Sequence, residues 1–231
     1  MSVSSTSTTA SFTADEIVLA ESVGGKLYRL ASFSKTVNLA IGGAGGMDVG
    51  TVPDSGFVAL YAIYNPTANT SALLAVNASS ALAPEVYNGV NMPSGYIASA
   101  LVSVWRVVSG QFTVGHQRNR HVSFPLITVY STSAGVTTIS SLSFSAAVPK
   151  NAVMINGYLT IYENQVGSGI ELSLYSSASG IGQLRGNATV TGQTSASITN
   201  GVLHVIDSQI LYYNMANTYG QYGIGCTGYE F

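Results

Sequence analysis

The sequence predicts an all-β protein, built as an antiparallel β-sandwich or a jelly-roll-like fold. Apolar and polar residues alternate with a period of two along most of the chain. Turn signals rich in Gly, Pro, Asn and Asp recur at short intervals, and only residues 13–24 carry helix-type signals. Short strands at regular spacing, with no helical pattern between them, are typical of sandwiches and jelly rolls.

The N-terminal segment is the most ambiguous part of the chain. Residues 1–12 are rich in Ser and Thr, so we expect a linker or an extended arm. In residues 13–24, Thr13 and Glu16 have the spacing of a capping box, and Gly24 suits a helix end. Against a helix, the same segment contains three β-branched residues: Ile17, Val18 and Val23. We therefore expect extended backbone here.

The remaining strands are predicted from their periodicity. Residues 57–64 are apolar on both faces, which indicates a central strand covered on each side. Residues 101–108 are similar, with Trp105 expected as a core anchor. Residues 153–163 and 170–175 alternate, which indicates strands with one buried face. Turn signals separate the strands at residues 42–46, 53–56, 65–66, 93–95, 109–110 and 200–201.

A seam near residues 122–136 divides the chain. The turn-rich STSAG stretch interrupts the strand pattern there. We expect one β module over residues 13–122 and a C-terminal β module over residues 123–231. With 231 residues, the two could also pack together as one large β domain.

The chain is unusually poor in charge. Only 8% of its residues are charged, against about 25% in ordinary soluble domains. We expect a hydroxyl- and amide-rich surface combined with burial against identical subunits, because homo-oligomerisation hides surface without adding charge. The sequence has no basic stripe for nucleic acid and no apolar run of the ~18–20 residues that membrane insertion needs. Its N-terminus lacks the pattern of a signal peptide.

No motif in the sequence predicts an enzyme, a metal site or a cofactor. Cys226 is the single cysteine, which excludes an intrachain disulfide and suggests no zinc site. Glu163 and Glu171 would face each other if the turn between them closes a hairpin, but opposed like charges destabilise a strand pair. His204 and Asp207 are accompanied by no nucleophile motif, and a core or interface histidine is the expected role.

Three clusters are candidate ligand-binding sites. Sugars bind to aromatic ring faces and to planar amides, and such residues gather near the C-terminus, at Asn217, Tyr219, Gln221 and Tyr222. The alternative is that these tyrosines pack between strands or subunits. The loop of residues 84–96 offers Tyr87 and Tyr96 as a second candidate. The third is the polar stretch 115–121, where Arg118 and Arg120 suit an anionic glycan, or else form a solvated hairpin turn.

Four pieces of the first 110 residues resemble modules near the C-termini of bacteriophage tail fibre and tail-appendage proteins. They are TADEIVLAES, LASFSKTVNLAIGGAGGMDVG, ALYAIYNPTANTSALLA and MPSGYIASALVSVWRV. The turn Gly46–Gly50 and the strand exit Ile63–Pro66 carry most of the resemblance, and the end of the chain, Gly228–Phe231, is similar to a closing strand of such modules.

The resemblance implies a receptor-binding protein of a phage tail fibre. It implies a homotrimer in the virion that contacts a bacterial surface polysaccharide or outer-membrane protein, joined to upstream tail fibre or baseplate components. No catalytic residues carry over, and the His-x-His iron site of some fibre tips is absent. Two other functions remain open from the sequence: a structural or decoration component of the virion, and a polysaccharide depolymerase or esterase fragment.

Overall fold

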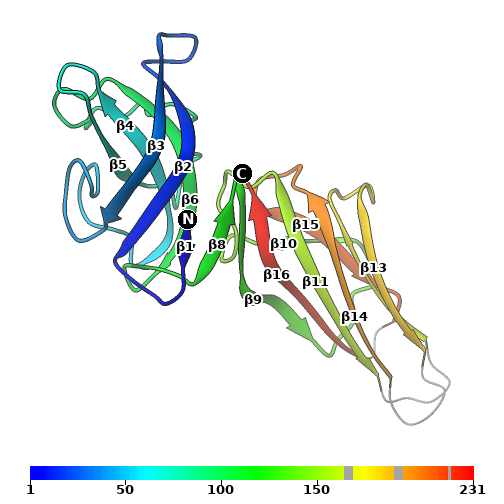
Figure 1. Ribbon diagram of the computed structural model, residues 1–231. Helices are drawn as coiled ribbons and strands as arrows, with labels where there is room; N and C mark the ends of the chain where they lie inside the picture. Colours follow the sequence, from blue (N-terminus) through cyan, green and yellow to red (C-terminus); the bar gives the residue numbers. More distant parts are fainter. Residues whose placement is uncertain (164–168, 190–194, 218–219) are drawn as a thin grey trace. The chain divides into compact units, whose positions relative to one another are not determined.

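The computed structural model describes residues 1–163, 169–189, 195–217 and 220–231, and within these ranges the chain contains strands and no helix. The all-β prediction is confirmed. The chain forms two compact units (Figure 1). The N-terminal unit comprises residues 1–122 with 149–151, and the C-terminal unit comprises residues 123–148 with 152–231.

An antiparallel sheet in the order β3-β2-β6-β4-β5 forms the N-terminal unit, and β7 is added beside β6. The strand β1 pairs antiparallel with β8. The strands are β1 (Ser2–Val3), β2 (Thr9–Ala20), β3 (Leu27–Asn38), β4 (Ser55–Asn65), β5 (Thr70–Asn77), β6 (Ala98–Val108), β7 (Gln111–Phe112) and β8 (Gly115–Arg118).

The core of this unit lies around β4 and β6. Residues 57–63 of β4 are all buried, and β4 pairs with β5 on one side and β6 on the other. This confirms the prediction of a central strand. Trp105 on β6 is 1% exposed, and its indole N–H donates to the Thr113 carbonyl at 2.9 Å. The predicted core anchor is therefore also hydrogen-bonded.

Two N-terminal ambiguities are resolved in favour of strands. Thr9–Ala20 pairs with Leu27–Asn38 in a long hairpin (Figure 1), so the β-branched residues outweigh the capping-box spacing. Residues 1–12, for which we expect a linker or an extended arm, include the strand Ser2–Val3 and the buried residues Val3 and Ala10. The hydroxyls of such a polar segment can pair across a sheet, as Ser11 does with Thr36 at 2.7 Å.

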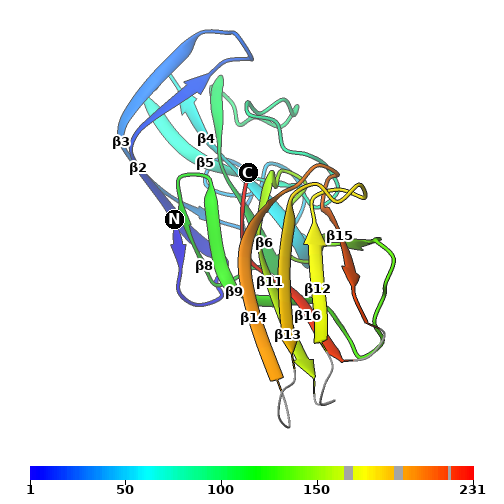
Figure 2. The ribbon, with the colours of Figure 1, turned by 90° about the vertical axis from the view of Figure 1, so that its right-hand side faces the viewer.

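The C-terminal unit is a sandwich of two four-stranded antiparallel sheets, whose strands run from green β9 to red β16 in Figure 2. One sheet has the order β9-β16-β11-β14 and the other β10-β15-β12-β13. The strands are β9 (His121–Thr132), β10 (Ser140–Ser143), β11 (Met154–Glu163), β12 (Gly169–Tyr175), β13 (Gln183–Thr189), β14 (Ser195–His204), β15 (Ile210–Met215) and β16 (Gln221–Glu230).

The strand order of this unit is that of a jelly roll. Counted from the first strand, one sheet contains the first, eighth, third and sixth strands, and the other contains the second, seventh, fourth and fifth. Between the sheets, Ile155, Leu159 and Ile161 of β11 are buried, as the alternation predicted. Val153, expected on the same face, precedes β11 and is 52% exposed.

Candidate ligand-binding site

A glycine-rich loop between β3 and β4 attaches to the edge of β5. The Gly45 N–H donates to the Leu73 carbonyl at 2.7 Å, and the Asp48 N–H donates to the Ala75 carbonyl at 2.8 Å. Gly46 must be glycine, because a Cβ there would lie 2.2 Å from the backbone oxygen of Ile41. This tight loop fixes the position of Asp48 beside β5.

Tyr87 reaches Asp48 from a different loop. Its hydroxyl donates to Asp48 Oδ2 at 3.0 Å, and its ring lies edge-on to the ring of Tyr61, with centroids 5.5 Å apart. Tyr61 is 1% exposed, and its own hydroxyl donates to the Pro84 carbonyl at 2.8 Å. The Tyr87 backbone N–H is held by Ser99 Oγ at 2.9 Å. The side chain is thus fixed at both ends.

Together these residues form a pocket of about 160 Å³, which we call the Asp48–Tyr87 pocket. Buried Tyr61 contributes its floor, and Asp48 and Tyr87 are half-buried lining residues. The rim is exposed and consists of an apolar side chain and two amides: Leu82, Asn77 and Asn88. An apolar and aromatic lining with a few convergent polar groups is typical of small-ligand sites.

The polar groups of the pocket have defined hydrogen-bonding roles. Burial raises the pKa of Tyr87 to about 12, and the bond to Asp48 acts in the same direction. Burial also raises the pKa of Tyr61. Both phenols therefore stay protonated at neutral pH. Asp48 accepts from the Val49 N–H at 2.8 Å as well as from Tyr87. Because a carboxylate offers about four acceptor sites, it retains capacity for ligand hydroxyls.

Of the two tyrosines predicted in the loop of residues 84–96, only Tyr87 lines this pocket. Asn88 from the same loop also lines it, and the Asn91 N–H donates to the Tyr87 hydroxyl at 3.3 Å. Tyr96 lies elsewhere, in a turn where its N–H donates to the Pro93 carbonyl. Asp48 and Tyr61 were missed, because no sequence pattern indicates that the glycine-rich turn would attach to β5.

The two predicted arginines do not converge on one site. The guanidinium of Arg120 donates to both carboxylate oxygens of Glu85, at 2.9 and 2.5 Å. Arg118 is exposed at the end of β8. The stretch between them contains Asn119 in a left-handed conformation, with φ of 55°, at the turn into β9. This geometry matches the hairpin-turn alternative.

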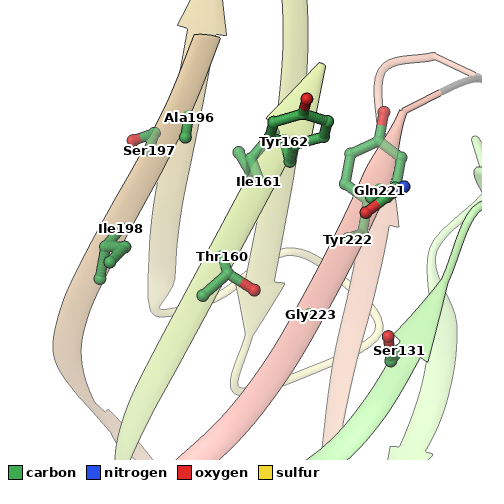
Figure 3. A pocket seen from close by; sticks show the side chains of 10 residues that line it. All are labelled: Ser131, Thr160, Ile161, Tyr162, Ala196, Ser197, Ile198, Gln221, Tyr222 and Gly223. Atoms are coloured by element: carbon green, nitrogen blue, oxygen red, sulfur yellow. The ribbon is translucent and has the colours of Figure 1, made fainter. Parts of the chain in front are cut away.

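The predicted C-terminal ligand-binding residues do not form one accessible site. Tyr219 lies outside the described residues. Tyr222 is a core residue, 2% exposed, with its hydroxyl 3.5 Å from the carbonyl oxygen of Asn217, so its ring is not available for stacking. Gln221 is exposed at the start of β16 and lines a shallow hollow with Thr160 and Tyr162 (Figure 3).

Glu163 and Glu171 do not face each other as they would in a simple hairpin. The strands that carry Glu163 and Glu171 belong to different sheets of the jelly roll, and the turn between them lies outside the described residues. Glu163 is buried, whereas Glu171 accepts hydrogen bonds from Arg185 and Ser173 on the outer surface. A local turn signal cannot tell a hairpin from a crossing between two sheets.

The other reactive side chains also have structural surroundings. His204 is exposed at the end of β14, and Asp207 accepts from the Tyr212 hydroxyl at 2.7 Å. Burial raises the pKa of the Cys226 thiol to about 12. In the described ranges no three His, Cys, Asp or Glu residues are grouped so as to hold a metal ion. The same ranges contain no helix that is long and apolar enough to cross a membrane.

The fold and pocket define a two-unit all-β protein with a jelly-roll C-terminal unit and a compact aromatic and carboxylate pocket in its N-terminal unit. No protein family model matches the chain. No curated protein matches it either.

Proposed function

We propose that this chain is a receptor-binding protein of a phage tail fibre, which attaches the virion to a bacterial surface glycan through the Asp48–Tyr87 pocket. The observation that carries the proposal is the Asp48–Tyr87 hydrogen bond above the buried ring of Tyr61. A sugar ring has apolar faces and a rim of hydroxyls. The pocket offers the half-buried ring of Tyr87 to the apolar faces, and a carboxylate and two amides to the hydroxyls.

The resemblance of the first 110 residues to tail fibre modules supports the biological setting. The turn Gly46–Gly50, which carries much of that resemblance, also contains Asp48. In this proposal the chain acts as a homotrimer joined to upstream tail fibre or baseplate components. Several copies of a weak pocket on one particle raise the overall affinity through multivalency.

A binding screen tests the proposal. The purified chain, labelled with a fluorophore, is applied to a bacterial glycan array and to a panel of bacterial cells. We expect binding to a defined set of surface polysaccharides, and loss of that binding in Asp48→Asn. Tyr28→Phe serves as the control, since Tyr28 also donates to a carboxylate, that of Glu21, but at an exposed position.

The same screen distinguishes the other functions. No binding to any glycan or cell would indicate a structural or decoration component. Released oligosaccharide after incubation with capsule or lipopolysaccharide would indicate a depolymerase. Cell binding that is lost after protease treatment of the cells would indicate a surface protein as the receptor. Each of these results contradicts the proposal.

A further inference from the structure

One outer face of the jelly roll is apolar. It belongs to the sheet β9-β16-β11-β14. Ile198 and Val202 on β14 are 63% and 61% exposed, and Leu126 on β9 and Tyr162 on β11 are 47% and 41% exposed. Half-buried Tyr158 lies between them on β11. We call these five side chains and the surface around them the apolar face.

Charge is almost absent from the same sheet. Its four strands contain two residues of the Asp, Glu, Lys and Arg types, Glu163 and Glu230. Glu163 is buried toward the interior, and Glu230 lies at the last position of β16. Covering this face therefore removes water from apolar side chains without removing water from charged groups, whose desolvation costs free energy.

The opposite outer face has a different character. The strands β10, β12, β13 and β15 contribute none of the large exposed apolar side chains of the described residues. Instead, a hydrogen-bonded network crosses that face: Gln183 donates to Ser173 at 3.0 Å, Tyr175 donates to Asn214 at 3.0 Å, and Arg185 pairs with Glu171. Ser173 is buried within this network, whereas Gln183 and Arg185 are exposed, so this face presents polar side chains. The contrast within one sandwich shows that the apolar face is a specific feature.

The apolar face is uneven, with projecting side chains beside hollows. A hollow lies beside Gly223 on β16, and in Figure 3 the bare ribbon at Gly223 lies between Thr160 and Ser131. A second hollow, of about 440 Å³, is lined by Tyr158, Val202 and the glycine Gly201 among others. Projecting Ile, Val and Tyr side chains beside hollows make a surface that an identical surface can fill.

The size of the face fits a subunit interface. Four strands about 4.8 Å apart, each of roughly ten residues at about 3.3 Å per residue, give a face of roughly 600 Å² before side-chain relief is counted. A stable interface buries about 800 Å² per partner. The hollows of this face are also lined by hydrogen-bonding side chains, among them Asn156, Asn200 and Thr227, so the face combines projecting apolar side chains with polar groups.

We infer that the apolar face packs against a second copy of this chain. The inference deepens the oligomeric part of the proposed function and rests on the C-terminal unit alone. In such an assembly the exposed apolar side chains of a chain with 8% charged residues are covered by an identical surface.

Light scattering after size-exclusion chromatography tests this inference. We expect the native chain to elute at a multiple of 23.9 kDa, and the double variant Ile198→Lys/Val202→Lys to elute at 23.9 kDa. The matched control, Ser141→Lys/Asn187→Lys, places two lysines at exposed positions of the opposite sheet and should keep the native mass. Far-UV circular dichroism of each variant confirms its fold, and all four positions are exposed, so folding should be unaffected.

Thiol labelling gives a second readout that does not depend on the lysine variants. Cys226 is buried, so a cysteine introduced by Val202→Cys is the accessible thiol. We expect maleimide to label Val202→Cys at least tenfold more slowly than Ser141→Cys at high protein concentration, and equally fast on dilution to monomer.

A monomeric native chain, or an oligomer that survives both lysines, would overturn the inference. So would loss of cell binding in the lysine variant at unchanged mass, which would assign the face to another partner. Asp48→Asn should leave the mass unchanged, so the two proposals fail separately.

Discussion

At the scale of single residues, the phenol of Tyr87 is the group on which the pocket depends. It joins three parts of the N-terminal unit, because its hydroxyl contacts the glycine-rich loop, its ring contacts β4, and its backbone contacts β6. The sequence already singled out Tyr87 as a tyrosine in a loop that also contains asparagines. Its partners Asp48 and Tyr61 lie 39 and 26 positions away, and only the folded chain brings them together.

Replacing Tyr87 by Phe removes the hydrogen bond to Asp48 and the longer one that the Tyr87 hydroxyl accepts from the Asn91 N–H. We expect Tyr87→Phe to lower the free energy of unfolding by about 0.5–1.5 kcal/mol. Urea denaturation followed by the fluorescence of Trp105, the single tryptophan and a residue of the same unit, measures this. Tyr28→Phe, which breaks an exposed bond, should cost less than about 0.5 kcal/mol. Equal losses in both variants would argue against a specific role for the buried bond.

Cys226 provides a residue-scale test of the jelly-roll core. With its pKa raised from 9.0 to about 12 by burial, roughly one thiol in ten thousand is ionised at pH 8. The thiol ionises near pH 9 in the unfolded chain. Its contribution to the free energy of unfolding is therefore fully present below pH 9 and is lost as the pH rises toward 12. A disulfide reagent at pH 8 should react with Cys226 only after denaturant is added. Full reaction within seconds in the native protein would show that the sandwich core is open.

At the scale of elements, strands were predictable and their assembly was not. The apolar strand β4 and the alternating strands β11 and β12 follow from local periodicity, which needs no knowledge of neighbours. Glu163 and Glu171 show the limit one level higher, because β11 and β12 belong to different sheets, which their local pattern does not indicate. The strand pairing within residues 1–12 could not be predicted for a similar reason, since the partner of Ser2–Val3 is β8, more than 110 residues away.

The glycine-rich loop offers a test at this scale. Gly46→Ala would place a methyl group 2.2 Å from a backbone oxygen, which a rigid loop cannot accommodate without moving. We expect it to lower the free energy of unfolding by about 1–3 kcal/mol and to displace Asp48 from Tyr87. Ala is tolerated better at Gly42, where the nearest atom is 3.8 Å away, so Gly42→Ala is the control. Denaturation curves that coincide for Gly46→Ala and the native chain would contradict the loop geometry.

At the scale of the whole molecule, the scarcity of charge and the uneven faces of the jelly roll are the observations behind our proposal that the protein works in an assembly. The sequence already pointed to burial against identical subunits through its composition. It could not indicate the face, because Ile198, Val202 and Leu126 come from two strands that are far apart in the chain and share one sheet only in the fold. An oligomer formed there would present several Asp48–Tyr87 pockets to one bacterial surface.

The most direct test of the account is titration calorimetry with an oligosaccharide from whichever polysaccharide the binding screen identifies. Asp48→Asn removes the charge and one acceptor from the pocket while keeping its size. Because hydrogen bonds to charged groups contribute about 1.5–3 kcal/mol, we expect its Kd to rise at least about tenfold, with Tyr28→Phe unchanged. A Kd that is the same for Asp48→Asn and the native chain, with both folded, would contradict the assignment of the Asp48–Tyr87 pocket as the receptor site.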